Sequence, residues 1–486
     1  MGGAARREDR AAASHAVGIQ DLVERALPDS SATLPPRPTA VLERRLGPFD
    51  AAAIVVSNVI GGGIFFVPVI VAQMVPNGAA MLGVWVAGGV LAFVGAMAYA
   101  ELAARRPHAG GEYVYLRDAF GPGAAFLTGW TSFVAGFSGA VAASSVALAE
   151  YVGRFVPAAG NATPLFTVPL PLVPLVFSPK ALVALAAILS LTLIHIRGLG
   201  PGSLLQNVLA GLKTTALLLM IAFGFALGSG NAAAITAGTP ASGSGMLLAL
   251  VPIMFSYSGW NAATYVAEEV RNPGRNVPLA LGLGTAAVIL IYVALNALYL
   301  YALPIAELAT LPNGRLLDIV AERLFGFAAG NLVAVFTIVS LSASISAMTL
   351  AGPRVYYAMA RDGMFLSAAS SVHPRFRTPA TAIAAQGIWS SVLVLCGSMS
   401  QLVSYTGFAV VLFAGIGVAS LFVLRRRDAG TPAPFRAWGY PWAPAIFVLA
   451  SLTMVVNEII RNGAPAIAGV AVIALGIPVY YLFARR

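Results

Sequence analysis

The chain has 486 residues, of which 58% are hydrophobic and only 10% are charged, whereas soluble domains carry about 25% charged residues. Its 29 lysine and arginine residues contribute to a formal net charge of +10, but they lie in short clusters between long apolar stretches and not along one polar face. This composition excludes a soluble protein, argues against nucleic acid as a partner, and identifies an integral membrane protein.

Residues 1–47 differ from the rest of the chain because they are polar, rich in arginine and serine, and include the sequence PPRP. This composition predicts a disordered basic tail on the cytoplasmic side of the membrane. The tail has no apolar core of the signal-peptide kind, so we expect no cleaved leader. Its role stays open.

After the tail, hydropathy predicts twelve membrane-spanning helices. With the N-terminus in the cytoplasm, 23 of the 29 basic residues fall in the tail, the inside loops and the C-terminus, and only five fall outside. This asymmetry follows the positive-inside rule, and it predicts a multi-pass protein of the plasma (inner) membrane with both termini in the cytoplasm. The predicted spans are 49–75, 79–103, 123–155, 179–196, 203–228, 245–268, 279–303, 328–352, 379–398, 401–424, 441–460 and 464–484.

The first span contains the sequence SNVIGGGIFFVP over Ser57–Pro68, with three consecutive glycines at Gly61, Gly62 and Gly63. Each glycine costs about 1 kcal/mol relative to alanine in a helix interior, so the glycines predict a break in the helix. Non-helical backbone at membrane depth is tolerated only where it is buried in protein or lines a cavity. The break therefore indicates a binding site, and the alternative is close packing of helices against small residues.

The sixth span is interrupted in a similar way by the small and polar residues of Ser256–Asn261, SYSGWN. Two broken helices five spans apart are the relation expected of two inverted five-helix repeats, in this chain 48–228 and 245–424, followed by two additional helices in 441–486. In such folds, half-helix N-termini hold a carboxylate, and unwound carbonyl groups hold a cation or an ammonium group. An α-amino acid carries both groups.

Three stretches of the sequence resemble the amino acid–polyamine–organocation superfamily. IGGGIF in the first span resembles its glycine motif, and residues 97–121, MAYAELAARRPHAGGEYVYLRDAFG, are similar to its second span and following loop. Residues 255–281, FSYSGWNAATYVAEEVRNPGRNVPLAL, most resemble the L-type amino acid transporter branch. The resemblance extends over about residues 48–425. It implies an all-α membrane protein with twelve helices in a LeuT-type 5+5 inverted repeat, with helices 1 and 6 broken.

The resemblance also implies that main-chain groups bind the substrate. The α-carboxylate would be bound by the amides of Gly61, Gly62 and Gly63, and the α-ammonium by the carbonyl groups of Val59, Gly62, Phe255 and Ser258. The family often has serine at the central glycine, and Gly62 stands there in this chain, so a hydroxyl contact is absent.

Three residues of the sixth span have further implied roles. Gly259 would let the backbone pass close to the ligand, and Phe255 would form an aromatic gate, with simple packing as the alternative. Asn261 would brace the unwound segment through hydrogen bonds from its side chain to the backbone.

Lys213 is the only lysine or arginine in the interior of a predicted span, whereas Arg154 and Lys180 lie at the outer ends of theirs. An ionisable residue within the membrane is a functional hypothesis by default, and the alternative is a side chain that reaches to an interface. The resemblance implies that its amine lies where sodium-coupled relatives hold a sodium ion, and that it bridges the first span to the eighth, where Ser344 and Ser346 are candidate partners. Two hypotheses follow: transport does not need sodium, and Lys213 exchanges a proton.

Glu101 ends the second span, and Glu268 and Glu269 end the sixth. Carboxylates at a span end beside Arg105 and Arg271 are more typical of interfacial ion pairs than of proton carriers. No histidines have a metal-ligand spacing, so we expect no metal and no other cofactor.

The sequence therefore predicts a secondary transporter of amino acids that works by alternating access. We expect neutral substrates because neither broken segment carries an acidic or a basic side chain, and the alternative is a carrier of cationic amino acids or polyamines. Proton symport, exchange and uniport stay open. A membrane enzyme would need a cluster of ionisable residues inside the spans, which the sequence lacks, and a channel fits two broken helices less well.

The expected partners are the amino acid substrate and the lipid bilayer. Animal L-type relatives pair with a heavy chain through an extracellular cysteine before span four. Cys396 is the only cysteine in this chain and lies at the end of span nine. We therefore expect no disulfide-linked partner.

Overall fold

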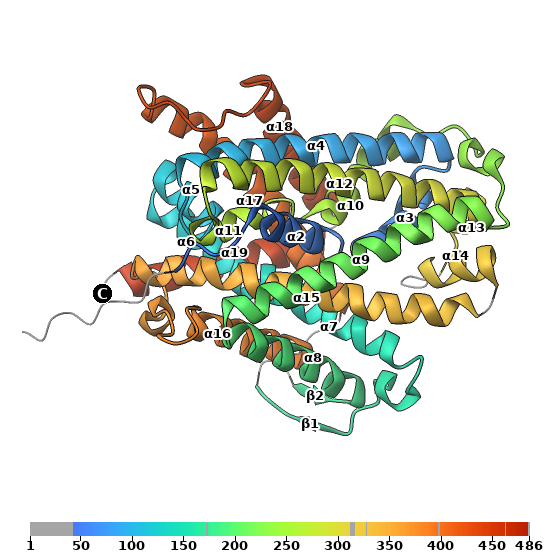
Figure 1. Cartoon of the computed structure of the whole chain (residues 1–486), viewed down its shortest axis with the longest axis horizontal. Coiled ribbons are helices and arrows are strands. Elements are labelled where there is room, and N and C mark those ends of the chain that lie inside the picture. Colours follow the sequence, from blue (N-terminus) through green and yellow to red (C-terminus); the bar gives the residue numbers. More distant parts are fainter. Residues whose placement is uncertain are drawn as a thin grey trace, which may run out of the picture. The chain divides into compact units, whose positions relative to one another are not determined.

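The computed structural model describes residues 42–171, 174–311, 316–326, 328–396, 399–461 and 463–484, and the predicted tail over 1–41 lies outside these ranges. Nearly all of the regular structure in these ranges is helical (Figure 1). The exception is an antiparallel pair of short strands, β1 (Phe166–Val168) and β2 (Leu175–Phe177), in which Phe166 lies opposite Phe177.

The helices follow one another along the chain with mostly short connections. The first half of the chain forms α2 (Pro48–Val59), η1 (Gly63–Phe65), α3 (Val67–Met74), α4 (Gly78–Arg105), α5 (Glu112–Phe120), α6 (Pro122–Thr131), η2 (Ser132–Gly136), α7 (Phe137–Val152), η3 (Pro157–Gly160), α8 (Pro179–Ile196), α9 (Leu199–Leu227) and η4 (Ala232–Thr236). The second half forms α10 (Gly243–Tyr257), α11 (Ala262–Tyr265), η5 (Ala267–Glu269), α12 (Pro273–Ala302), α13 (Ile305–Leu308), α14 (Leu316–Phe325), α15 (Ala329–Arg361), η6 (Ser367–Ser370), α16 (Ala380–Cys396), α17 (Met399–Arg427), α18 (Trp442–Arg461) and α19 (Gly463–Ala484).

Many of these helices suit a membrane. Within the described residues, eight helical stretches are long and apolar enough to cross a bilayer, and four further apolar helices are shorter. Each of the predicted spans falls on helical structure. A multi-pass, all-helical membrane protein is thus confirmed, and the number of twelve spans stays a prediction.

Both predicted helix breaks are present. Helix α2 ends at Val59, and a short 3₁₀ turn at η1 separates it from α3. Helix α10 ends at Tyr257 and α11 begins at Ala262, with Gly259 between them at a φ of +98°. Glycine adopts this left-handed backbone without the steric cost that a Cβ atom would add, which explains its position in the second break.

The two breaks lie directly against each other. A Cβ atom on Gly63 would come 3.0 Å from Cα of Ser256, and one on Gly259 would come 2.9 Å from Cβ of Asn58. The hydroxyl of Tyr292 on α12 lies between the breaks, where the carbonyl oxygens of Val59 and Ser256 are 2.7 and 3.2 Å away. Glycine is therefore needed at both contacts because the backbones approach closely.

Long helices hold these breaks in place. Helix α12 runs beside α4 (Figure 1) and also contacts α2, while α15 packs along α7 and α9. Trp85 of α4, Tyr257 of α10 and Tyr292 of α12 form an aromatic cluster with ring centroids 5.0 to 5.8 Å apart. Because these rings are buried, they fix the second break against the body of the protein.

The end of the predicted tail is ordered. The amide of Leu46 donates to the carbonyl of Glu269, and the amide of Arg271 donates to the carbonyl of Leu46, both at 2.9 Å. The Leu46 side chain is buried. The prediction of disorder up to residue 47 is therefore wrong for 42–47, because backbone pairing with the segment after η5 holds these residues.

Substituting Gly259→Ala should destabilise the protein by about 1–3 kcal/mol, because the new Cβ meets Asn58 and the backbone keeps a left-handed φ. The matched control is Gly83→Ala, at an exposed site of α4 where a Cβ meets nothing within 4 Å. This control should leave stability unchanged or raise it by up to about 1 kcal/mol. Thermal unfolding of the two detergent-purified variants measures the difference, and equal midpoints would contradict the prediction.

Candidate functional site

A cavity of about 180 Å³ lies at the two helix breaks. All eight residues predicted to bind the substrate line it, and so do residues of α6, η2, α7, α15 and α17. The cavity therefore joins the two broken helices to three other long helical segments. The predicted residues in its wall are Val59, Gly61, Gly62, Gly63, Phe255, Ser258, Gly259 and Asn261.

The main-chain groups of the first break are not all available to a ligand. The carbonyl of Val59 accepts hydrogen bonds from the Gly61 amide and from the Tyr292 hydroxyl, each at 2.7 Å. A carbonyl oxygen has two lone pairs, so this group is saturated within the protein. By contrast, the amides of Gly63 and Ile64 open the 3₁₀ turn at η1, where the first N–H groups have no intrahelical partner.

The carbonyl groups of the second break are less heavily used. The Phe255 carbonyl accepts one hydrogen bond, from the Ser258 amide at 3.0 Å. In the first break, the carbonyl of Gly62 likewise accepts one hydrogen bond, from the Phe65 amide at 2.9 Å. One lone pair on each oxygen therefore stays available for a donor in the cavity.

The side chains of the second break have distinct contacts. The ring of Phe255 lies 6.3 Å from the ring of Phe66, centroid to centroid, and both line the cavity. The amide of Asn261 donates to the hydroxyl of Tyr265 at 3.0 Å. Asn261 thus braces the segment through another side chain, and the prediction of a side-chain bond to the backbone is wrong, because Tyr265 lies one helical turn further on the same face.

Lys213 lies behind the first break and is fully buried. Its amine donates to the carbonyl of Ile60 and to the Ser344 hydroxyl at 2.9 Å, and the Ser57 carbonyl lies 3.3 Å away. The carbonyl groups at the end of α2 have no intrahelical partner, so the amine supplies the donor that they lack. Lys213 does bridge the first break to α15, and its role in coupling stays a prediction.

Ser346, the other candidate partner of Lys213, faces elsewhere. Its hydroxyl lies 2.8 Å from Nε2 of His195 on α8. Two residues along an α-helix correspond to a rotation of about 200°, so Ser344 and Ser346 point to opposite sides of α15. The prediction that Ser346 contacts Lys213 is therefore wrong.

Glu112 is a residue of the cavity wall that the sequence analysis did not identify. It opens α5, and its carboxylate accepts hydrogen bonds from the hydroxyls of Tyr99, at 2.8 Å, and of Tyr265. Burial raises the pKa of Glu112, and the two hydroxyl donors partly offset this effect. The only signal in the sequence was the acidic residue in GGEYVY, and no periodicity places a loop helix beside a membrane cavity.

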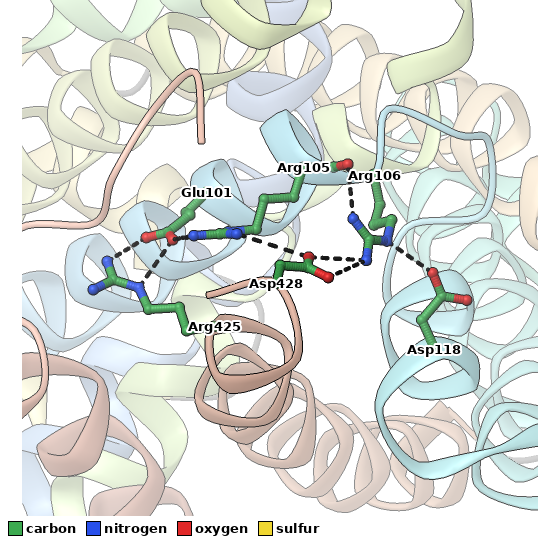
Figure 2. Close-up of polar contacts among 6 residues, drawn as sticks. All are labelled: Glu101, Arg105, Arg106, Asp118, Arg425 and Asp428. Carbon is green, nitrogen blue, oxygen red and sulfur yellow. Dashed lines mark hydrogen bonds and ion pairs between the residues drawn. The ribbon is translucent and has the colours of Figure 1, made fainter. Parts of the chain in front are cut away.

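The carboxylate of Glu101 forms the ion pair predicted with Arg105, at 2.9 Å, and a second one with Arg425 of α17. Figure 2 shows how the network continues from Arg105 and Arg106 through Asp428 to Asp118 at the end of α5. These contacts link the ends of α4, α5 and α17.

Two more ion pairs join the segment after the second break to α15. Glu269 pairs with Arg354 at 2.7 Å, with both side chains almost fully buried, and Glu268 pairs with Arg361 at 3.2 Å. The arginine that follows these carboxylates in the sequence, Arg271, forms neither of these two pairs, and its amide donates to the carbonyl of Leu46. The prediction that these carboxylates form ion pairs is confirmed, and their place at the membrane interface stays a prediction.

Comparison with known proteins gives consistent matches along almost the whole chain. The family described as "Amino acid permease" matches residues 46–483. The b(0,+)-type amino acid transporter 1 of Mus musculus is 30% identical over 453 residues, which are 92% of this chain and 89% of the relative. The Large neutral amino acids transporter small subunit 2 of Homo sapiens is 28% identical over 453 residues, 91% of this chain and 80% of the relative. The Serine/threonine exchanger SteT of Bacillus subtilis is 28% identical over 448 residues, 92% and 98% of the two chains.

Substituting Glu269→Gln should destabilise the protein by about 3–5 kcal/mol, because it leaves the buried Arg354 without its counter-charge. The matched variant Glu268→Gln should cost at most about 1 kcal/mol, since the side chain of its partner Arg361 is 48% exposed. Heating the purified variants and measuring the fraction that stays monodisperse ranks the two. A larger loss for Glu268→Gln would refute the distinction between the pairs.

Proposed function

This chain belongs to the amino acid permease family, and we propose that it is a secondary transporter of neutral amino acids that works without sodium, by alternating access. Members of the family are membrane transporters and not enzymes. The observation that carries the proposal is the cavity at the two helix breaks, which is lined by main-chain groups with unused hydrogen-bonding capacity. Such groups suit a zwitterion, because amides bind a carboxylate and carbonyls bind an ammonium group.

The amide of Gly63, which lines the cavity and opens η1, supports binding of the α-carboxylate on the first break. The carbonyl groups of Gly62 and Phe255, each with a lone pair left, support binding of the α-ammonium. Phe66 and Phe255 supply an apolar wall beside them. In this proposal Phe255 covers the bound substrate, and its ring must move for the substrate to leave.

Independence from sodium is supported by the position of Lys213. A sodium ion would need several oxygen ligands, and the amine of Lys213 already binds the carbonyl oxygen of Ile60 and the hydroxyl of Ser344. A cation in the same place would compete with the amine for these oxygens. We therefore propose that Lys213 replaces a coupling cation as the link between the broken helix and α15.

The proposed architecture is a LeuT-type fold of twelve spans in two inverted repeats of five, with both termini in the cytoplasm of a plasma (inner) membrane. It is supported by the two breaks, which face each other as inverted repeats require, and by the excess of arginine in the loops placed inside.

The relatives named for large neutral amino acids and for serine and threonine support neutral substrates. Proton symport and exchange are both compatible with this arrangement.

The function is tested by uptake of a radiolabelled amino-acid mixture into proteoliposomes, with and without sodium, a pH gradient and unlabelled amino acid inside. We expect uptake that is indifferent to sodium. Dependence on a pH gradient would identify a proton symporter, and uptake only into preloaded vesicles would identify an exchanger. Absence of amino-acid uptake under every condition, with uptake of a polyamine instead, would refute the proposal.

Substituting Lys213→Ala should reduce the rate of uptake at least tenfold, because it removes the donor to Ile60 and Ser344 and frees the broken helix from α15. Lys180→Ala is the matched control, since Lys180 is the other lysine of the chain and pairs with Glu150 at 2.9 Å. The control should transport normally. Full activity in Lys213→Ala, measured per folded protein in the vesicles, would contradict both a bridging and a proton-exchanging role.

A further inference from the structure

Glu112 is the one charged side chain among the described residues that line the cavity. The other lining residues are apolar, aromatic, glycine or uncharged polar residues. The charge of the cavity wall therefore depends on whether this carboxyl group carries a proton. An amino acid that enters the cavity brings a side chain of its own charge into contact with this wall.

The surroundings of Glu112 leave its charge without a cationic partner. The residue is 7% exposed, and its two carboxylate oxygens accept hydrogen bonds from Tyr99 of α4 and Tyr265 of α11. Tyr115 on the same helix is a further titratable neighbour. Within the described part of the chain, Glu112 forms no ion pair with arginine, lysine or histidine.

Charged groups on the elements packed against α5 contact other residues of that helix or of the loop before it. Arg106 of the α4 end and Arg427 of α17 contact Asp118. Asp362, at the end of α15, contacts Arg117 and also the hydroxyl of Tyr113. Glu268 accepts a hydrogen bond from the amide of Ala109, in the loop before α5. None of these contacts involves the Glu112 carboxylate.

We infer that Glu112 determines the side-chain charge of the amino acid that the cavity accepts. With the carboxyl group protonated, the cavity wall is neutral and accepts a neutral amino acid. With the group ionised, the wall carries one negative charge and accepts an amino acid whose side chain ends in a cation. The inference rests on the proposed function and refines it, because it makes the choice between neutral and cationic substrates depend on pH.

The physical reason is the cost of an unpaired charge in a poorly solvated place. An ionised Glu112 has only two hydroxyl donors, and a carboxylate offers about four acceptor sites, so an ammonium or guanidinium group on the substrate can still bind to it. A neutral side chain beside the carboxylate would leave the charge uncompensated, which favours uptake of a proton. The raised pKa of Glu112, caused by burial, brings this protonation closer to neutral pH than for an exposed glutamate.

The experiment measures exchange of labelled L-alanine in proteoliposomes and its inhibition by unlabelled L-alanine and by L-lysine, at about pH 5 and about pH 8. In the unmodified protein, inhibition by lysine relative to alanine should rise about tenfold between the two pH values, which corresponds to about 1.4 kcal/mol. In Glu112→Gln the ratio should be low and independent of pH, because glutamine does not ionise. Glu112→Asp should restore the dependence on pH.

The control variant is Glu150→Gln, whose side chain is 66% exposed and lies outside the cavity lining. It should behave as the unmodified protein does. A ratio that does not change with pH in the unmodified protein, or one that changes equally in Glu112→Gln, would overturn the inference. The first of these results is measured on the unmodified protein alone. The inference can therefore be tested even if Glu112→Gln folds poorly.

A second measurement separates this inference from the proposed function. Because the pKa of Glu112 is raised by folding, the protonated group contributes stability that is fully present below the unfolded pKa and is lost as pH rises through the folded pKa. Thermal unfolding without ligand should therefore show the unmodified protein losing stability relative to Glu112→Gln as pH rises. If no amino acid is exchanged at any pH, the proposed function fails. The difference in stability between the unmodified protein and Glu112→Gln then still decides whether Glu112 binds a proton in the folded protein. A difference that does not change with pH would overturn the claim that it does.

Discussion

The structure depends on one constraint, namely that a polar backbone group inside a membrane needs a hydrogen-bond partner. At the two breaks the helix no longer supplies these partners. The hydroxyl of Tyr292 donates to the carbonyls of Val59 and Ser256. Lys213 and Ser344 donate to the carbonyl of Ile60 at the end of α2. Other backbone groups of the breaks line the cavity. The cavity is thus bordered by the backbone groups that the protein leaves incompletely satisfied, and this is why a small zwitterion suits it.

Charge is distributed unequally around this cavity. Toward the ends of the helices, the carboxylates of Glu101, Glu268 and Glu269 each have an arginine partner, and these pairs join α4, η5, α15 and α17. Glu112 has tyrosine hydroxyls instead. Paired carboxylates join helices through salt bridges, whereas a carboxylate held by neutral donors can take up a proton without the loss of a salt bridge. The two kinds of environment therefore separate structural carboxylates from one that can respond to a substrate.

Only those features of the site that depend on residues close together in the sequence could be predicted from the sequence. The positions of both breaks followed from consecutive glycines and from small polar residues in otherwise apolar spans. Side-chain partners did not follow: Ser346 contacts His195, and Glu269 contacts Arg354. These choices depend on the rotation of one helix against another, which hydropathy does not encode. Glu112 was missed for the same reason, since its contact with the cavity arises from the packing of α5 against α4 and α11.

The sequence by itself determined that the chain is a multi-pass membrane protein, where its first and sixth spans break, and which superfamily it resembles. These properties come from composition, from glycine's lack of a side chain and from short motifs, all of which are readable along the chain. Only the tertiary structure decided that the two breaks meet, that Lys213 reaches Ile60 and Ser344, and that Glu112 enters the cavity wall. Those contacts join residues up to about 200 positions apart, and such pairings are set by how the helices pack together.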